Sequence, residues 1–324
     1  MYRKNCLQNK FVVCLLVFSL LCSILAACSP IAESSDPSPE LVTFTDALGR
    51  EVSLPKNPKR VAALIGSFAD IWTLAGGTVC ATADDAWDDF GLDLPDAINL
   101  GSTKSPSLEA LFSSDPDLVL ASSATAKNVE WREILEQAKI PVAYFDVACF
   151  EDYLHMLKIC TDLTGRGDLY EQNGTQIQTK IDQLKASFSV ENLPEAQRSV
   201  LFLRASSGYI RAKNSHGSIL GEMLQDLGCK NIADSDTSLL ENLSIESILR
   251  ADPYRIFIVQ VGDDTVAVQK NLSTMMEENP AWQDLSAVKA DRVHIMDKRL
   301  FNLKPNARWA EAYEKLCEIL QNEM

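Results

Sequence analysis

Four cationic side chains gather between positions 298 and 308, near the end of a chain that is otherwise strongly acidic. They are Lys298, Arg299, Lys304 and Arg308. An aromatic ring and two amides stand among them, at Phe301, Asn302 and Asn306. Guanidinium and ammonium groups pair with oxyanions and stack on aromatic rings, so this stretch favours binding of a planar or anionic ligand. The alternative is a solvated turn before the last helix.

A further cation with a nearby aromatic follows an apolar run. Arg204 and Tyr209 come after residues 199–203, which are typical of a buried strand. In open α/β sheets, ligands bind beyond the carboxyl ends of the strands. The same reasoning selects residues that follow other expected strands or open a helix: Ser67, Phe68, Trp87, Ser123 and His216. Core or rim packing is the alternative for the two aromatic residues, and plain solvent exposure is the alternative for the histidine.

The histidines and cysteines form no metal-binding or disulfide pattern. The three histidines share no loop, so a cage for a bare metal ion is not expected. The cysteines beyond position 28 are scattered and contain no Cys-x-x-Cys pair: Cys80, Cys149, Cys160, Cys229 and Cys317. We therefore expect small core cysteines, and neither a resident metal nor any other cofactor.

An internal repeat predicts how the candidate residues are positioned. Residues 107–120 return as residues 244–257, with serine, glutamate, aspartate and proline at identical offsets. The pattern is typical of a short helix, a turn containing proline and a buried strand. Two copies are too few for a solenoid. We infer a duplicated domain whose two lobes face each other across a ligand cleft.

Strand and helix signals alternate in both halves of the chain, as in parallel sheets with helical crossovers. After a hairpin at 44–55, apolar runs predict strands at 61–65, 79–82, 118–121, 142–145, 199–203, 256–259 and 292–296. Residues 151–189 keep helical spacing without strand signals, interrupted at 165–167. The predicted fold is therefore α/β, with two Rossmann-like lobes, each with a parallel sheet, joined by a long α-helix.

The N-terminus has the features of an export signal. Arg3, Lys4 and Lys10 precede an apolar run that ends in small residues before Cys28. This ending also resembles a bacterial lipobox, which implies that Cys28 is lipidated and anchors the protein outside the cytoplasm. An uncleaved membrane anchor is the alternative. Residues 28–42 are rich in serine, proline and acid, and are expected to form a disordered tether.

Composition argues against two function classes. The chain carries 30 basic and 45 acidic residues, with a formal net charge of −15. Nucleic-acid binding needs a basic footprint, so no nucleic-acid partner is expected. The sequence also lacks a Gly-x-Ser-x-Gly elbow and a His-Glu-x-x-His motif. A binding protein is therefore favoured over an exported hydrolase.

Several short phrases occur together in a characteristic order over about residues 44–316. They lie at 46–50, 58–61, 107–109, 115–119, 227–231, 279–282, 287–289, 292–293 and 305–308. With the lipobox, they resemble the substrate-binding proteins of bacterial ABC importers, of the helix-linked type that serves ferric siderophores, haem and cobalamin. The resemblance implies a monomeric lipoprotein that captures an iron complex or a corrinoid and delivers it to a permease dimer with its ATPase. A lipoprotein ligand sensor of the same fold is the alternative.

The resemblance also implies roles for individual residues. Glu109 and Glu246, one per lobe, would pair with arginines on the permease. The repeat supports this role because a two-fold permease presents the same pocket to each lobe. Stabilisation of a helix N-terminus is the alternative. Separately, haem iron and cobalt can take an axial imidazole, so His216, which follows a polar loop and opens a helix, is a candidate for that position, with plain solvent exposure as the alternative.

These arguments divide the chain into five expected segments. They are a signal peptide at 1–27, a tether at 28–42, a first lobe at 43–150, a helical linker at 151–197 and a second lobe at 198–324. The ligand-binding domain of the family would cover about 59–324.

Overall fold

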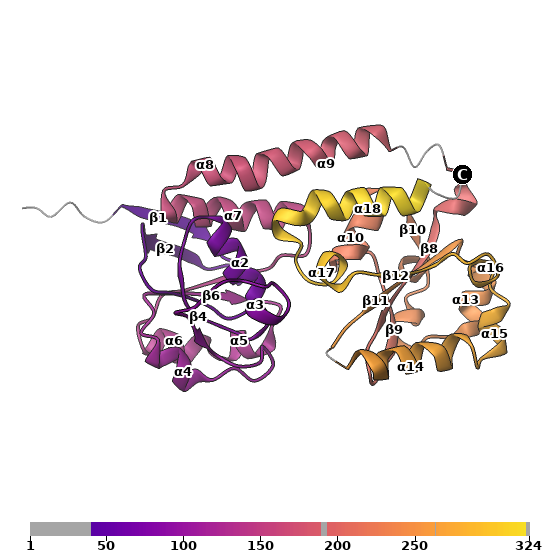
Figure 1. Cartoon of the computed structure of the whole chain (residues 1–324), viewed down its shortest axis with the longest axis horizontal. Coiled ribbons are helices and arrows are strands. Elements are labelled where there is room, and N and C mark those ends of the chain that lie inside the picture. The colour runs from indigo at the N-terminus through magenta and orange to yellow at the C-terminus, as the bar shows by residue number, and fades with distance from the viewer. Residues whose placement is uncertain (1–39, 189–192, 263, 322–324) are drawn as a thin grey trace, which may run out of the picture. The chain divides into compact units, whose positions relative to one another are not determined.

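The computed structural model describes residues 40–188, 193–262 and 264–321 (Figure 1). The expected signal peptide, Cys28 and most of the expected tether lie outside the described residues. Strand β1 (Leu41–Thr45) begins inside the stretch assigned to the tether, because Leu41 already pairs with Pro55 of β2 (Glu51–Pro55). The folded part therefore starts slightly before the expected boundary at 43.

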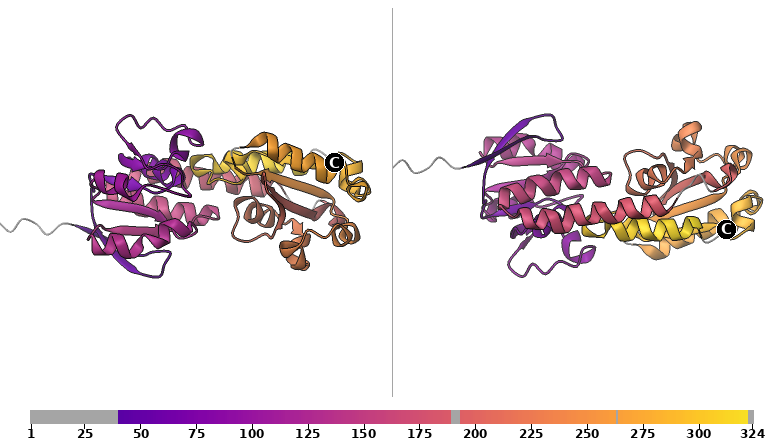
Figure 2. Two further views of the ribbon diagram at one scale, coloured as in Figure 1. Left: turned by 90° about the horizontal axis from the view of Figure 1, so that it is seen from below. Right: turned by 90° about the horizontal axis from the view of Figure 1, so that it is seen from above.

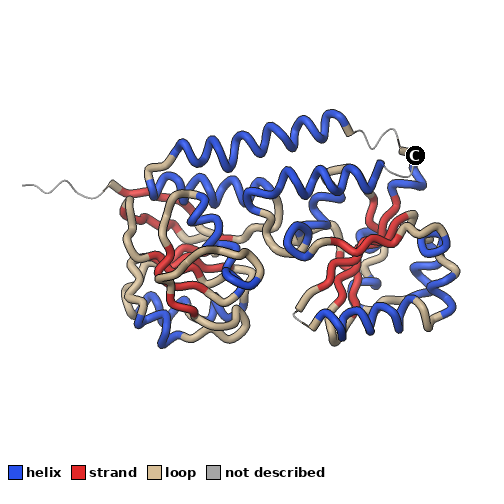
Figure 3. Tube along the Cα trace, in the orientation of Figure 1, coloured by secondary structure: helices blue, strands red, loops and turns tan. Residues whose placement is uncertain are grey.

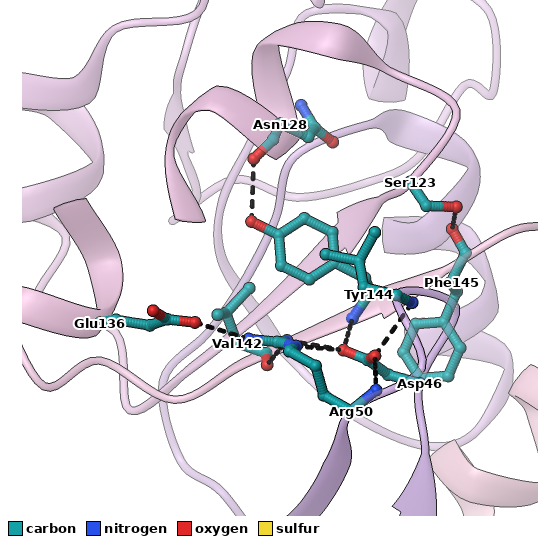
Figure 4. A network of polar contacts seen from close by, with 9 residues as sticks. Asp46, Arg50, Ser123, Asn128, Glu136, Val142, Tyr144 and Phe145 are labelled. Atoms are coloured by element: carbon teal, nitrogen blue, oxygen red, sulfur yellow. Dashed lines mark hydrogen bonds and ion pairs between the residues drawn. The ribbon is translucent and has the colours of Figure 1, made fainter. Parts of the chain in front are cut away.

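The Asp46 carboxylate closes the turn between β1 and β2. Its Oδ1 accepts the N–H groups of Leu48 at 3.0 Å and Arg50 at 3.1 Å, and its Oδ2 accepts Arg50 Nη2 at 2.6 Å. Arg50 Nη2 also donates to the Val142 carbonyl at 3.0 Å, and the Tyr144 N–H donates to Asp46 Oδ2 at 3.3 Å (Figure 4). Residues 46–50, the first of the characteristic phrases, thus connect the β1–β2 hairpin to the sheet of the first lobe by hydrogen bonds.

The first lobe contains a five-stranded parallel sheet in the order β5-β4-β3-β6-β7. Its strands are β3 (Val61–Ala63), β4 (Val79–Thr82), β5 (Ile98–Asn99), β6 (Leu118–Ser122) and β7 (Val142–Phe145). Its helices are α2 (Gly66–Leu74), α3 (Asp85–Asp88), α4 (Leu108–Ser113), α5 (Ala126–Glu130) and α6 (Arg132–Gln137). Strands and helices alternate along the chain, as the sequence predicts (Figure 3).

Two helical stretches follow, where the sequence suggests one long helix with an interruption. Helix α7 (Phe150–Thr164) ends at Gly165, whose φ of 70° is left-handed and suits glycine. The chain then continues through α8 (Gly167–Tyr170), a π-helical turn (Glu171–Thr175) and α9 (Gln176–Ser187). Helix α8, the π-helical turn and α9 together form the connector towards the second lobe (Figure 1).

The second lobe contains another five-stranded sheet, in which β10, β8, β11 and β12 are parallel. Its strands are β8 (Ser199–Ala205), β9 (Ile210–Lys213), β10 (Lys230–Asn231), β11 (Arg255–Gln260) and β12 (Val293–Met296). Strand β9 is antiparallel to β8 and has no counterpart in the sequence-based assignment. It departs from the simple alternation because a tight turn folds the chain straight back onto β8.

Further helices surround this sheet and close the chain. A 3₁₀ turn (Glu195–Arg198) precedes β8. The helices are α10 (Ile219–Asp226), α11 (Ile232–Ser235), α12 (Ser238–Glu241), α13 (Ile245–Ala251), α14 (Thr265–Met276), α15 (Pro280–Gln283), α16 (Ser286–Lys289) and α17 (Lys298–Phe301). A second 3₁₀ turn (Asn306–Arg308) leads directly into the last helix, α18 (Trp309–Gln321).

The internal repeat has the same backbone geometry in both lobes. Ser107 caps α4 by accepting the Ala110 N–H, and Ser244 caps α13 by accepting the Ser247 N–H. The aspartates of the two Asp-Pro turns both have positive φ, 46° at position 115 and 40° at position 252. Non-glycine residues seldom adopt this conformation, so its recurrence at matched positions supports duplication of one structural unit.

One apolar core runs through both lobes and the helices between them. It includes Phe68 in the first lobe, Phe202 in the second and Phe150 in α7. The rings of Phe150 and Trp309 pack edge to face with centroids 5.7 Å apart, at the first residues of α7 and α18. Helices α9 and α18 lie side by side (Figure 2). The connector is therefore packed against the last helix and is not a free-standing rod.

The helices are too short or too polar to act as membrane spans within the part of the chain that the structure describes.

Candidate functional site

The strongest candidate site is a basic face on β8 and β9, formed by Arg204, Arg211 and Lys213. Arg204 is directly opposite Arg211 in the antiparallel register, and Lys213 is two positions further along β9. Opposite residues of an antiparallel pair share a face, and so do alternate residues of a strand. The three cations therefore point to the same side of the sheet. They lie near the carboxyl end of β8, which is the sheet edge where α/β folds bind ligands.

The turn between β8 and β9 adds an exposed phenol to the basic face. The Ser206 N–H donates to the Tyr209 carbonyl at 2.8 Å, and Ser206 Oγ accepts the Gly208 and Tyr209 N–H groups at 3.2 and 3.1 Å. Tyr209 is 40% exposed, and the guanidinium carbon of Arg211 lies 4.7 Å from the centre of its ring. This pair offers both a ring face and hydrogen-bond donors to a ligand.

Lys304 brings a fourth positive charge to the basic face from the segment before α18. Its ammonium is within electrostatic range of Arg204 in the second lobe and of Asp146 and Asp85 in the first. Burial lowers the pKa of Lys304, the Asp146 carboxylate opposes this effect, and the charge of Arg204 adds to it. Burial likewise lowers the pKa of Arg204 and of Lys213. Arg204, Lys213 and Lys304 are thus partly removed from water, and the charge of Arg204 acts on both lysines.

These four cations have no carboxylate partner at ion-pair distance among the described residues. In addition, Arg204 Nε is buried without a hydrogen-bond partner among those residues. Clustered like charges and an unsatisfied buried donor both cost free energy. An anion bound against the basic face would remove both costs, so the arrangement suits a negatively charged ligand.

Arg299 and Lys298, from the cationic stretch at 298–308, contact the first lobe. Arg299 Nη2 donates to Asp70 Oδ2 at 3.2 Å, and Arg299 Nη1 donates to the Lys304 carbonyl at 2.6 Å. Lys298 Nζ donates to Asp89 Oδ1 at 2.8 Å. The prediction that Arg299 binds the ligand is therefore not retained. Its acidic partner lies far away in the sequence, so the local pattern could not reveal the pairing.

The two phenylalanines predicted to contact ligand belong to the apolar core. Phe68 is 0% exposed and packs edge-on against Phe145 with ring centroids 6.2 Å apart. Phe301 is 2% exposed and belongs to the same core. Both rings are buried in this structure, and ligand contact by either one stays a prediction.

Arg308 is also engaged away from the basic face. Its Nε and Nη2 donate to the two carboxylate oxygens of Glu311 at 2.6 and 2.8 Å. Both residues line a groove of about 600 Å³ between α9 and α18. A bidentate pair within one helical turn satisfies the guanidinium. The prediction that Arg308 binds the ligand is therefore not retained.

The remaining residues that the sequence predicts to bind the ligand differ in how exposed their side chains are. The Ser67 side chain is nearly buried, and its carbonyl accepts Asn306 Nδ2 at 2.9 Å. Ser123 Oγ donates to the Phe145 carbonyl at 3.4 Å (Figure 4), and Trp87 is half-buried against the core. The His216 side chain is 68% exposed, with Nδ1 3.8 Å from Glu222 Oε1. A role of these residues in binding stays a prediction, and for His216 the solvent-exposed alternative fits this position.

The sequence analysis predicts no role for Arg211 or Asp70, for two different reasons. Residues 210–213 alternate apolar and cationic side chains after a Ser-Ser-Gly turn, which is a hairpin signal that would have placed Arg211 opposite Arg204. For Asp70 no such signal exists. It lies on the apolar-rich helix α2, and only the tertiary structure brings Arg299 to it.

Metal-ligating and thiol groups do not gather at the basic face. No group of three or more histidine, cysteine, aspartate or glutamate side chains is close enough to hold a metal ion within residues 40–188, 193–262 and 264–321. The five cysteines of these ranges are free thiols. Burial raises the pKa of the half-buried Cys149 thiol to about 12, so it stays protonated at neutral pH.

The two glutamates of the repeat occupy matched positions. Glu109 and Glu246 each follow the first residue of their helix, are exposed, and make no side-chain hydrogen bond or ion pair to the described residues. In both lobes the helix leads through the Asp-Pro turn to the start of a parallel strand, which sets its N-terminus towards the carboxyl edge of the sheet. Both carboxylates are thus free at corresponding sites of the two lobes.

Comparison with known proteins establishes the family. A model of the periplasmic binding protein family matches residues 61–300. The chain therefore belongs to the periplasmic binding protein family, which confirms the resemblance seen in the sequence. The match lies within the region of about 59–324 expected for the ligand-binding domain.

Individual relatives agree with this assignment. The chain is 25% identical to the Fe(3+)-citrate-binding protein YfmC of Bacillus subtilis, over 90% of each chain. SirA of Staphylococcus aureus, solved in complex with staphyloferrin B, has a TM-score of 0.65 at 22% identity, covering 87% of this chain and 98% of SirA. The iron uptake ABC transporter substrate-binding protein PiuA of Streptococcus pneumoniae has a TM-score of 0.66 at 20% identity, covering 89% and 99%. These two structures confirm the two-lobed α/β fold.

Proposed function

We propose that this protein captures an anionic iron complex, such as a ferric carboxylate or catecholate siderophore, and delivers it to an ABC permease. The observation that carries the proposal is the unpaired basic face of Arg204, Arg211 and Lys213 with Lys304 beside it. The chain has a formal net charge of −15, and yet these unpaired cations cluster on one face of a sheet. Binding of an anion would explain this cluster.

The names of the relatives favour particular classes of ligand within this proposal. The B. subtilis relative is named for ferric citrate, and the S. aureus structure holds staphyloferrin B. The S. pneumoniae structure is named as part of an iron uptake ABC transporter. Family membership together with the basic face favours an iron chelate with several negative oxygens over a neutral one. Haem, through its propionates, and cobalamin are the alternatives within the same proposal.

The site would lie where the two lobes approach each other. Lys304 is within range of carboxylates of the first lobe and of Arg204 in the second, so a ligand held by the basic face would also contact the first lobe. Trp87 and Ser123 are the first-lobe residues proposed to contribute to it. The complete protein would be a lipoprotein with its anchor at Cys28, working outside the cytoplasm as a monomer, with Glu109 and Glu246 docking the permease.

Calorimetric titration of the purified protein tests the ligand class. Ferric citrate, a ferric tris-catecholate, a neutral ferric trihydroxamate, haem and cobalamin would each be added to the wild type and to Arg204→Ala. Tight binding of an anionic complex, weakened at least about tenfold by the substitution, is expected from loss of a charged hydrogen-bond donor. Arg250→Ala, at an exposed arginine of the same lobe, is the matched control and should bind normally. Equal affinity for the neutral hydroxamate would contradict the proposal.

A further inference from the structure

Arg299 joins the first lobe to the backbone of Lys304. Its Nη2 donates to Asp70 Oδ2 at 3.2 Å, and its Nη1 donates to the Lys304 carbonyl at 2.6 Å. Its guanidinium carbon also lies 4.0 Å from the centre of the Phe90 ring. The side chain is only 18% exposed, and that of Asp70 is 14% exposed. One side chain thus bridges helix α2 of the first lobe and the segment that carries Lys304.

Asn306 fixes the other side of Lys304. Its Nδ2 donates to the same Asp70 Oδ2 at 2.8 Å and to the Ser67 carbonyl at 2.9 Å. Asn306 is 0% exposed and has a φ of 56°, a left-handed conformation that costs energy in a non-glycine residue. Asparagine adopts this conformation more readily than most residues, and here its side chain reaches both Asp70 and the Ser67 carbonyl. Lys304 lies between two residues that are both hydrogen-bonded to Asp70.

The ammonium of Lys304 has no comparable restraint. It makes no hydrogen bond or ion pair to the described residues, although Arg204, Asp146 and Asp85 lie within electrostatic range. Its repulsion by Arg204 would tend to move it away from the basic face. The position of its charge therefore depends on how firmly the backbone at Lys304 is held.

We propose that Asp70 and Arg299 are positioning residues that hold Lys304 beside the basic face, so that a bound anion meets four cations at once. This inference rests on the proposed function, since it assumes that the ligand is an anion on the basic face. Neither residue would touch the ligand. A rigid supporting shell raises affinity because less freedom is lost when the ligand binds.

The geometry provides a matched control on the same helix. Lys298 Nζ donates to Asp89 Oδ1 and Oδ2 at 2.8 and 3.0 Å, which is also an ion pair between the lobes. Its side chain makes no hydrogen bond or ion pair to Lys304 or Asn306. Asp70→Ala and Asp89→Ala each remove one carboxylate of the first lobe and one ion pair to α17. Only the first removes the support of Lys304.

Titration of the full-length protein in detergent with ferric citrate and a ferric tris-catecholate tests the inference. Asp70→Ala and Lys304→Met should each weaken binding about fivefold to tenfold, and the double variant should be no weaker than Lys304→Met alone, since both act on one group. Asp70→Asn, which keeps an acceptor for Asn306 and Arg299, should recover part of the loss. Asp89→Ala should bind within about twofold of the wild type.

Other outcomes distinguish the positioning role of Asp70 and Arg299 from the proposed function. Equal losses in Asp70→Ala and Asp89→Ala, or additive losses in the double variant, would overturn the positioning role while leaving the proposed function intact. Wild-type protein that binds neither complex would overturn the positioning role, and it would overturn the proposed function as well if haem and cobalamin also fail to bind. If Asp70→Ala does not fold, as judged by circular dichroism, Asp70→Asn and Arg299→Lys combined with Lys304→Met give the same test of additivity.

Discussion

Arg204 on β8 and Arg211 on β9 stand directly opposite each other in an antiparallel pair. Opposite positions in such a pair bring side chains close together, and like charges there destabilise the sheet. Lys213 on the same face and Lys304 beside it increase the repulsion. The basic face thus costs stability in the ligand-free protein, and this cost is a measurable sign of a binding role.

Removing one of the opposed arginines should stabilise the ligand-free protein. Arg211→Gln is expected to raise the free energy of unfolding by about 0.5 kcal/mol at low salt, because it removes a cross-strand repulsion between like charges. Salt screens exposed charges, so the gain should shrink at high ionic strength. Urea unfolding at low and high salt measures the effect. Arg250→Gln is the control, and an equal gain there would show that net charge alone is responsible.

The pH dependence of stability should report on Asp85. Burial raises the pKa of Asp85 to about 6, and the nearby Asp89 and Asp84 carboxylates raise it further, against the Gly66 N–H that donates to it at 2.8 Å. The folded state therefore holds this proton more tightly than the unfolded chain. The resulting stability is fully present below the ordinary pKa near 4 and is lost as the pH rises through about 6.

Asp85→Asn should remove this loss while keeping the hydrogen bond, because an amide oxygen also accepts the Gly66 N–H. When the pH rises from 4 to 7, the free energy of unfolding should fall by about 2 kcal/mol less in the variant than in the wild type. Urea unfolding at several pH values would measure the difference. Asp88→Asn, on the exposed side of the same helix, serves as the control. An unchanged pH profile in Asp85→Asn would show that the buried carboxylate does not control the effect.

Ligand binding should cause little change in compactness. The lobes share one apolar core through α7 and α18, and Arg299 and Lys298 link them by ion pairs. Wide hinge motions need a few unrestrained residues between lobes, whereas the described parts of α7, α9 and α18 all contribute to the shared core. Small-angle X-ray scattering with and without saturating ferric complex should give nearly equal radii of gyration. A large contraction on binding would contradict this prediction.

The matched glutamates should act in transport and not in capture. Glu109→Ala combined with Glu246→Ala should leave ligand affinity unchanged and abolish uptake of the ferric complex by cells. The reason is that both carboxylates are exposed and unpaired among the described residues, at equivalent sites of the repeat. The control is Glu133→Ala combined with Glu241→Ala, two other exposed glutamates, one from each lobe. Loss of affinity in the first double variant would place Glu109 or Glu246 in the ligand site instead.

Local patterns were enough to predict most of the fold. The strands at Val79–Thr82 and Val142–Phe145 and the helix at Leu108–Ser113 match the predicted ranges, because buried strands and short helices leave runs and spacings that are visible in a few residues. The repeat identified the two-lobed plan. Strand β9 was missed because four residues with two cations do not resemble a buried strand.

The site was harder to predict because charge alone does not reveal a partner. The cationic stretch at 298–308 divides into three roles: Lys298 and Arg299 bind the first lobe, Lys304 lies beside the basic face, and Arg308 pairs with Glu311. Only tertiary structure separates these roles, since Asp70 and Asp89 are more than two hundred positions away. Arg204 lies within β8, one residue before its end, and Tyr209 lies in the turn that follows, close to the expected positions after the strand.

The last helix, α18, has a consequence for how the protein is made. Trp309, Leu316 and Leu320 of this helix belong to the same core as Phe68 and Phe150, which lie in the first half of the sequence. A growing polypeptide cannot complete that core until α18 has been synthesised. Until then, α7 and α9 would lack the surface that α18 packs against them, and late completion of the core would keep the unfinished chain accessible to chaperones.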